Sequence, residues 1–298
     1  MFSSLNARAL GLALSPVETI ELAARHGFGG VDLLVRDLVA AGIDPQELRT
    51  RIDAAGLRGG AWPLPVDWRG PVEPFARDLA RLPRLAAAAA TLGLTRTGTW
   101  VTPETPAIVA GSGDPAARHA AAVRLHIERL GAIARTLDAE GIRLGLEVIG
   151  VASARTRRGA PFVHRLADLD RVLGDVWLEA PNLGVLVDGF HLYAAGEPVE
   201  AGLAWGVRRV VWVHVADLPR SAPPDRAAIQ DHDRGLPGEH PAVPTADLLR
   251  RLAIAGYDGP VTPEPMAGCR SLAGLTPEQA VRRLAGALST VWPGEIPA

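Results

Sequence analysis

Four ionisable side chains stand at the ends of four short apolar segments that have the character of β-strands. The segments read LGLE, VLVD, VVWVH and VTPE, and they end at Glu147, Asp188, His214 and Glu264. The carboxyl ends of parallel strands meet on one face, so these side chains are expected to converge. Their mostly oxygen ligand set suits a catalytic divalent ion, with Mn²⁺ or Mg²⁺ favoured and Zn²⁺ or Co²⁺ also compatible. Because three buried carboxylates are costly without a cation, a bound ion would also explain how such a site folds.

The elements that must position these side chains alternate along the whole chain. Segments with strand character are separated by segments with helical periodicity, which is typical of β/α units around a parallel sheet. Eight strands are predicted, at residues 10–14, 30–35, 57–62, 95–101, 142–149, 183–188, 210–216 and 260–264. The length of 298 residues accommodates a TIM barrel, which typically has about 250 residues, together with long loops. The sequence therefore predicts an α/β protein with a single (β/α)8 TIM-barrel domain over residues 1–298.

Capping residues mark the starts of several helices. Ser15, Asp44 and Thr276 each precede a proline, and each has Glu or Gln three residues later, as in a capping box. The longest helix is predicted from about residue 114 to 140, and Pro83 is expected to break or kink the helix that contains it. Three long irregular stretches follow strands and are expected to lie over the catalytic face, at residues 101–113, 150–161 and 218–244.

Composition excludes several classes of protein. The chain has no lysine, and all 31 basic residues are arginine, so Schiff-base aldolases, pyridoxal-phosphate enzymes and Walker-type NTPases are excluded. The net charge of −2 gives no reason to expect a nucleic-acid partner. We expect neither a signal peptide nor a membrane partner, because no segment has the required apolar pattern. The one cysteine, Cys269, favours a cytoplasmic location and has no evident activating base.

Five motifs occur in order along the second half of the chain. They are LGLEVIG around Glu147, LGVLVDGFH through Asp188 to His191, VVWVHVAD around His214, DRGLPGE at 233–239 and YDGPVTPEP around Glu264. With these motifs the chain resembles the sugar isomerase/epimerase superfamily of xylose-isomerase-like TIM barrels. The resemblance implies that the glutamate, aspartate, histidine and glutamate at the ends of strands five to eight hold one metal ion.

The resemblance also implies residues that bind a substrate beside the metal. His191 is expected to lie near the metal, and Arg234 is expected to reach substrate hydroxyls with its planar fork of donors. The string PFVH is similar to one in relatives, which makes His164 and the preceding Arg158 candidates for the rim of the site. The alternative, that these are ordinary loop side chains, stays open.

Aromatic and acidic residues near the predicted site have two interpretations each. Trp62 and Trp100 end the third and fourth predicted strands, where they would either form apolar walls for sugar carbons or pack in the core. Glu239 would either support the site or be an exposed carboxylate. The cluster Asp231-His232-Asp233 is expected to lie beside the ligands rather than among them.

The function that this resemblance implies is a metal-dependent sugar isomerase or epimerase of carbohydrate metabolism, acting on a ketose or related polyol through an enediolate. Glu147 and Glu264 would be the catalytic pair, one removing a proton and the other returning it. The alternatives are an inosose-type dehydratase, an endonuclease IV-like DNA-repair hydrolase and a non-catalytic barrel. A small sugar or polyol is the expected partner, and a homo-oligomer is compatible with the sequence.

Overall fold

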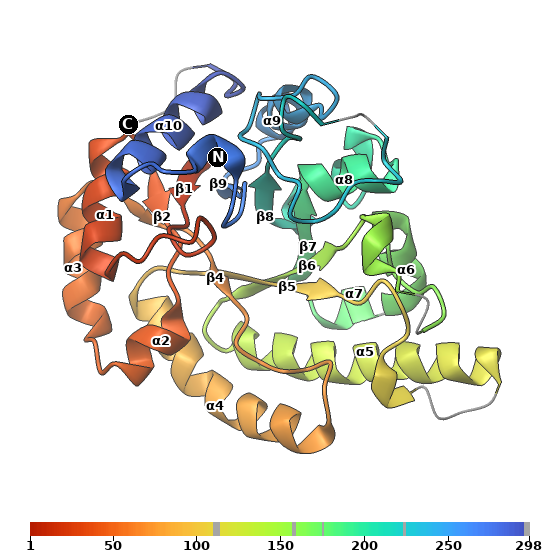
Figure 1. Ribbon diagram of the computed structural model, residues 1–298. Helices are drawn as coiled ribbons and strands as arrows, with labels where there is room; N and C mark the ends of the chain where they lie inside the picture. The colour runs from red at the N-terminus through yellow and green to blue at the C-terminus, as the bar shows by residue number, and fades with distance from the viewer. Residues whose placement is uncertain (110–113, 157–158, 175, 223–224, 295–298) are drawn as a thin grey trace.

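Parallel strands form the inner layer of the computed structural model, and helices surround them (Figure 1). The structure describes residues 1–109, 114–156, 159–174, 176–222 and 225–294. Within these ranges the strands are β1 Phe2–Leu5, β2 Gly30–Val31, β3 Arg58–Gly59, β4 Trp62–Pro63, β5 Arg96–Val101, β6 Arg143–Val148, β7 Leu183–Asp188, β8 Val210–Val215 and β9 Pro260–Pro263. Their order in the sheet is β3-β2-β1-β9-β8-β7-β6-β5-β4.

The sheet closes because β3 and β4 are two pieces of one strand. β3 pairs with β2, β4 pairs with β5, and only Gly60 and Ala61 lie between them. The Gly60 N–H donates to the Val31 carbonyl at 2.8 Å, which keeps this break next to β2. A side chain at Gly60 would meet the Asp32 carboxylate at 2.1 Å, so the backbone can approach the barrel interior only without one. Counted this way, eight strands close the predicted TIM barrel.

The outer layer consists of helices that follow the strands (Figure 1). The α-helices are α1 Pro16–Arg25, α2 Val35–Ala40, α3 Pro45–Ala54, α4 Val72–Thr91, α5 Pro115–Asp138, α6 Leu166–Leu173, α7 Val176–Glu179, α8 Gly189–Ala195, α9 Thr245–Ile254 and α10 Pro277–Ser289. Short 3₁₀ segments are η1 Ala107–Val109, η2 Ala152–Ala154, η3 Val199–Leu203, η4 Val207–Arg209 and η5 Arg270–Leu272. Within the described residues, every helix is too short or too polar to span a lipid bilayer.

The predicted helix starts are observed. Ser15 and Thr276 form reciprocal capping boxes, and Asp114 caps α5. Asp44 accepts from the Gln46 N–H, whereas Glu47 pairs with an arginine one turn later instead of completing the box. Of the two expectations for Pro83, a break or a kink, the break is not observed, because α4 continues from Val72 to Thr91 with this proline inside it.

Two strand predictions in the first quarter of the barrel are corrected. The first strand is β1, Phe2–Leu5, and residues 10–14 are part of the loop that follows it. Ser3 and Ser4 are polar but buried in this strand, because the Ser3 hydroxyl accepts from the Gly29 N–H at 3.1 Å and the Ser4 hydroxyl donates to Asp32 Oδ1 at 2.6 Å. The second strand is shorter than expected, since it ends at Val31 and α2 already begins at Val35.

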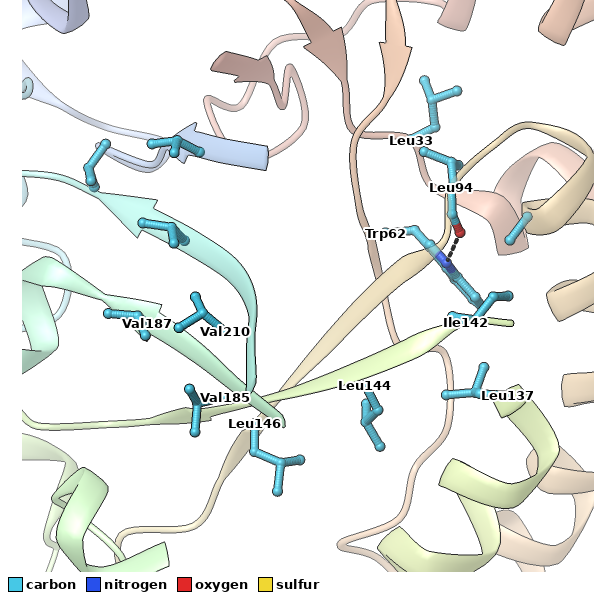
Figure 2. Close-up of a cluster of buried hydrophobic side chains, with 14 of the residues drawn as sticks. Leu33, Trp62, Leu94, Leu137, Ile142, Leu144, Leu146, Val185, Val187 and Val210 are labelled. Atoms are coloured by element: carbon cyan, nitrogen blue, oxygen red, sulfur yellow. Dashed lines mark hydrogen bonds between the residues drawn. The ribbon is translucent and has the colours of Figure 1, made fainter. Parts of the chain in front are cut away.

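Alternation along the strands separates the helix-facing core from the barrel interior. On β6, Leu144 and Leu146 are fully buried and point to the side on which α5 lies (Figure 2). Because successive side chains of a strand point to opposite faces, Glu147 points into the barrel. This alternation carries the ionisable side chains of β6, β7 and β8 to one interior end of the barrel.

Candidate metal centre

Four neighbouring strands bring the predicted ligands together. Glu147 lies near the end of β6, Asp188 ends β7, His214 lies near the end of β8 and Glu264 follows β9 directly. One ligand atom from each residue lies within 4.8 Å of the others. His214 Nδ1 is 3.5 Å from Glu147 Oε1 and 3.2 Å from Glu264 Oε2. The convergence that the strand ends predicted is therefore observed.

The residues at this centre fit a divalent metal ion. Both ring nitrogens of His214 are buried, and within the described part of the chain neither makes a well-aligned hydrogen bond, since Nδ1 contacts only the carboxylates of Glu147 and Glu264. The imidazole is therefore suited to bind a metal ion. Three carboxylates surround it, and such hard oxygen donors prefer divalent cations. Among the described residues, this is the one group of such side chains that lie close enough together to share a metal ion.

Electrostatics make the centre attractive to a cation. Burial alone would lower the pKa of His214, but the charges of Glu264 and Glu147 and their contacts with the ring raise it well above the usual value. Burial raises the pKa of Glu147. Burial also opposes ionisation of Glu264 and Asp188, yet nearby positive groups hold the pKa of both carboxyls below their usual values. The two glutamates of the cluster are thus electrostatically different.

Arg234 is the main positive group beside Asp188, and it adds to the effect of His214 on Glu264. Its side chain is 2% exposed, and Nη1 donates to Asp188 Oδ2 at 2.8 Å and lies 3.5 Å from Glu264 Oε2. Nη2 lies 2.9 Å from Asp231 Oδ1 and 3.1 Å from His191 Nε2. Since a guanidinium only donates, His191 Nε2 must accept, and the ring proton of neutral His191 is on Nδ1. His191 is anchored from the other side, because its backbone N–H donates to Asp188 Oδ1 at 3.2 Å.

The loop that carries Arg234 is fixed by two acidic residues. Asp217 and Gly235 exchange backbone hydrogen bonds, and the Asp217 carboxylate accepts from the Gly238 N–H and from the Thr245 hydroxyl. Glu239 accepts from the Leu236 N–H at 2.9 Å and from the Ser271 hydroxyl at 2.7 Å. Glu239 therefore links this loop to the one after β9. Of the two interpretations from sequence, support of the site and an exposed carboxylate, the structure favours support of the site.

A cavity of about 460 Å³ opens beside the ligand cluster. This volume lies within the range of sites for small organic molecules, about 300–1,000 Å³. Its lining residues are Trp100, Pro103, Glu147, Ile149, Ala154, His191, Asp231, Arg234, Glu264 and Met266. Both glutamates, His191, Arg234 and Trp100 thus face one space.

Sequence reasoning missed the cavity residue Met266. It has a φ of 64°, in the left-handed region that residues other than glycine rarely adopt. The segment Glu264-Pro265-Met266 turns sharply directly after a metal-ligand candidate, and backbone strain of this kind is common at functional sites. Proline at 265 was the one local signal of an unusual turn.

Three predicted substrate residues do not reach this cavity or cannot be placed. Trp62 is fully buried and packs near Leu33, Leu94 and Ile142, with its indole N–H donating to the Leu94 carbonyl at 3.1 Å (Figure 2). His164 lines a separate small pocket behind the site, where its Nδ1 is 3.5 Å from an aspartate oxygen. Arg158 lies outside the described residues.

We expect the wild-type protein to contain one divalent ion per chain and the His214→Ala variant to lose it. A ligand at one hundred times its dissociation constant stabilises the folded state by about 2.7 kcal/mol, so excess Mn²⁺ should raise Tm for the wild type but not for the variant. His232→Ala is the matched control, because His232 is 80% exposed in the same half of the chain. Elemental analysis showing equal metal content in wild type and His214→Ala would contradict the ligand assignment.

Several proteins of known structure share this fold. A xylose isomerase domain protein from Alicyclobacillus acidocaldarius is 28% identical, with 97% of each chain covered and a TM-score of 0.80. The IolI protein, solved with a zinc atom bound, is 16% identical, with 98% of each chain covered and a TM-score of 0.76. D-psicose 3-epimerase from Clostridium cellulolyticum H10, solved with D-tagatose, is 16% identical over 98% of each chain, with a TM-score of 0.69.

Comparison at the level of sequence gives a family. No curated protein sequence matches the chain significantly. The family model described as "Xylose isomerase-like TIM barrel" matches residues 20–290, which is most of the chain and includes all four ligand candidates. The chain therefore belongs to the xylose isomerase-like TIM-barrel family.

Proposed function

We propose that this protein is a divalent-metal-dependent sugar isomerase or epimerase that acts on a ketose or related polyol through an enediolate. The observation that carries the proposal is the placement of Glu147 and Glu264. Both line the 460 Å³ cavity, and both lie within 3.5 Å of the same histidine nitrogen in the ligand cluster. Two carboxylates that face one cavity can serve as base and acid for a single substrate.

The two glutamates are suited to moving a proton between two faces of a carbon atom. They come from strands that are separated by β7 and β8, so they approach the cavity from different sides of His214. Removal of a proton by one glutamate, followed by delivery of a different proton to the opposite face from the other glutamate in its protonated form, would invert the carbon. When bound, a divalent ion supplies Lewis-acid polarisation of the substrate oxygens, which acidifies the neighbouring C–H bond.

The remaining lining residues match the surface of a sugar. Trp100 is 41% exposed, and the guanidinium of Arg69 covers its ring at 3.8 Å from the centroid. A ring held in this way offers an apolar surface to C–H groups, as do Ile149 and Met266. Arg234 and His191 supply polar groups to the same lining, beside the acidic residues. The fold that this chain shares with D-psicose 3-epimerase agrees with a ketose as the substrate class.

The DNA-repair alternative receives less support. It would require a three-metal centre, whereas the ligand cluster found among the described residues has four members, too few for three ions. We therefore propose a small-molecule substrate over a nucleic acid.

Hydrogen exchange tests the proposed reaction. With Mn²⁺ in D₂O, substrate or product should gain deuterium at the carbon next to the carbonyl, without other change of mass. A panel of ketoses, sugar phosphates and inososes should be screened by mass spectrometry and NMR. A product lighter by one water would assign a dehydratase instead. Neither exchange nor turnover across the panel, with metal content verified, would reject the proposal.

A further inference from the structure

Another carboxylate, Asp32, is buried inside the barrel near the ligand cluster. Asp32 follows β2 directly and is 5% exposed. Its oxygens accept hydrogen bonds from the Ser4 hydroxyl at 2.6 Å, the Ala61 N–H at 2.8 Å and the Thr262 hydroxyl at 2.7 Å. All three partners are neutral, so burial of this carboxylate is costly for folding. A cost of this kind at the centre of a barrel calls for a functional explanation.

The hydrogen bonds run in one direction from a tryptophan to this carboxylate. The Trp212 indole N–H donates to Thr262 Oγ1 at 2.8 Å, and Thr262 Oγ1 donates to Asp32 Oδ2 at 2.7 Å. An indole can only donate, and a hydroxyl has one proton, so the threonine must accept from the indole and donate to the carboxylate. The chain of donors is consistent only if Asp32 Oδ2 is an acceptor.

Trp212 in turn contacts His214. The two residues are two positions apart on β8, so both point into the barrel. Their ring centroids are 4.4 Å apart and the rings are nearly perpendicular, at 81°. Among the described residues, Nδ1 of His214 contacts only the carboxylates of Glu147 and Glu264, and Nε2 has no hydrogen-bond partner. Packing against the indole therefore adds the contact that fixes the plane of the imidazole from the ring face. Metal-binding histidines are more often oriented by a hydrogen bond to the second nitrogen.

We infer that Asp32, Thr262 and Trp212 are positioning residues that hold the His214 ring in the orientation required to bind the divalent ion. This inference rests on the proposed metal-dependent function. Asp32 and Thr262 fix the indole, and the indole fixes the imidazole without a direct hydrogen bond to it. None of the three residues lines the 460 Å³ cavity or belongs to the ligand cluster, so they act through His214.

Affinity for Mn²⁺ alone, measured by isothermal titration calorimetry, tests the inference without any substrate. Asp32→Asn places an amide N–H₂ among three donors, and Thr262→Val removes the link to Trp212. We expect each change to weaken Mn²⁺ binding 10–100-fold, about the effect of losing an outer-sphere partner of a metal ligand. Thr262→Ser keeps the hydroxyl and should retain most of the affinity. The visible spectrum of the Co²⁺-loaded protein should change in the first two variants and not in Thr262→Ser.

Two variants elsewhere in the barrel serve as matched controls. Thr97 is a fully buried strand threonine whose hydroxyl donates to the Trp62 carbonyl, and the Trp62 indole N–H donates to the Leu94 carbonyl. Thr97→Val should lower Tm about as much as Thr262→Val does. Trp62→Phe should likewise lower Tm about as much as Trp212→Phe does. Neither control should change the Mn²⁺ affinity.

The outcomes separate this inference from the proposed function. Mn²⁺ affinity within twofold of the wild type in both Thr262→Val and Trp212→Phe would overturn the positioning role while leaving the metal centre in place. Equal losses of affinity in the controls would also overturn it, because the effect would then be general destabilisation. If the wild type itself binds no Mn²⁺, Mg²⁺, Zn²⁺ or Co²⁺, both the inference and the proposed function fail. If Asp32→Asn does not fold, the positioning role is still tested by two comparisons of Mn²⁺ affinity. These are Thr262→Val against Thr97→Val, and Trp212→Phe against Trp62→Phe.

Discussion

Glu147→Gln and Glu264→Gln are each expected to lower kcat by about 10²–10⁴-fold, the usual contribution of a positioned general acid or base. Glutamine keeps the size of the side chain but cannot accept the proton of a C–H bond. Each change also replaces a charged oxygen in the ligand cluster, so a weaker Mn²⁺ affinity is expected as well. Turnover measured at saturating Mn²⁺ isolates the loss of proton transfer from the loss of metal.

Two comparisons sharpen this prediction. The double variant should be little worse than either single variant, because residues that act as one unit have non-additive effects. Glu278→Gln is the matched control, since Glu278 is 55% exposed on α10 and pairs with Arg25 rather than with a residue of the site. A variant with kcat within tenfold of the wild type would remove that glutamate from the catalytic role.

Arg234→Met is expected to lower the free energy of unfolding of the metal-free protein by about 3–5 kcal/mol, the typical cost of removing one partner of a buried ion pair. The reason is that Asp188, whose side chain is fully buried, and Glu264 lose the cation that compensates their charge. Mn²⁺ should recover part of this loss, because the ion compensates the same carboxylates. Urea denaturation with and without Mn²⁺ measures both effects.

The loss of unfolding free energy in Arg234→Met should also depend on pH. Burial would raise the pKa of Asp188, but Arg234 holds the folded-state pKa below its usual value. A depressed carboxyl pKa stabilises the protein above the unfolded-state pKa, about 3.9 for aspartate, and this stabilisation is lost as the pH falls toward the folded-state pKa. The difference in the free energy of unfolding between wild type and Arg234→Met should therefore be largest at neutral pH and decrease as the pH is lowered.

An exposed arginine provides the control for this pair of measurements. Arg250 is 55% exposed and pairs with Asp247 on the surface of α9, so Arg250→Met should cost no more than about 1 kcal/mol. If Arg234→Met costs as little as Arg250→Met in the absence of metal, the guanidinium does not compensate the buried carboxylates as the structure indicates.

The ligand cluster was predictable because the information that specifies it is local. Each of Glu147, Asp188 and His214 lies at or near the end of an apolar strand, and Glu264 follows one directly. In a closed parallel barrel all strand ends of one kind lie together, so the order of residues was enough to place them. The capping residues Ser15 and Thr276 were predictable for the same reason, since their partners are three residues away.

Other features depended on contacts between distant segments. The polar residues Ser3 and Ser4 are buried in β1 only because the partners of their hydroxyls come from the next β/α unit, near Gly29 and Asp32. Trp62 and Trp100 had the same interpretation from sequence, yet only Trp100 lines the cavity. Ala61 packs inside the barrel with Trp212, so alternation turns Trp62 toward the outer core.

The sequence by itself determined the fold class and the metal-ligand candidates, because strand periodicity and strand ends are set by neighbouring residues. The cavity walls and the support of the ligands were decided only by the tertiary structure. Met266 reaches the cavity through an unusual backbone turn, and Asp32 supports His214 through Thr262, which is 230 residues away along the chain. Such contacts follow from barrel closure and loop conformation, which no local pattern of residues encodes.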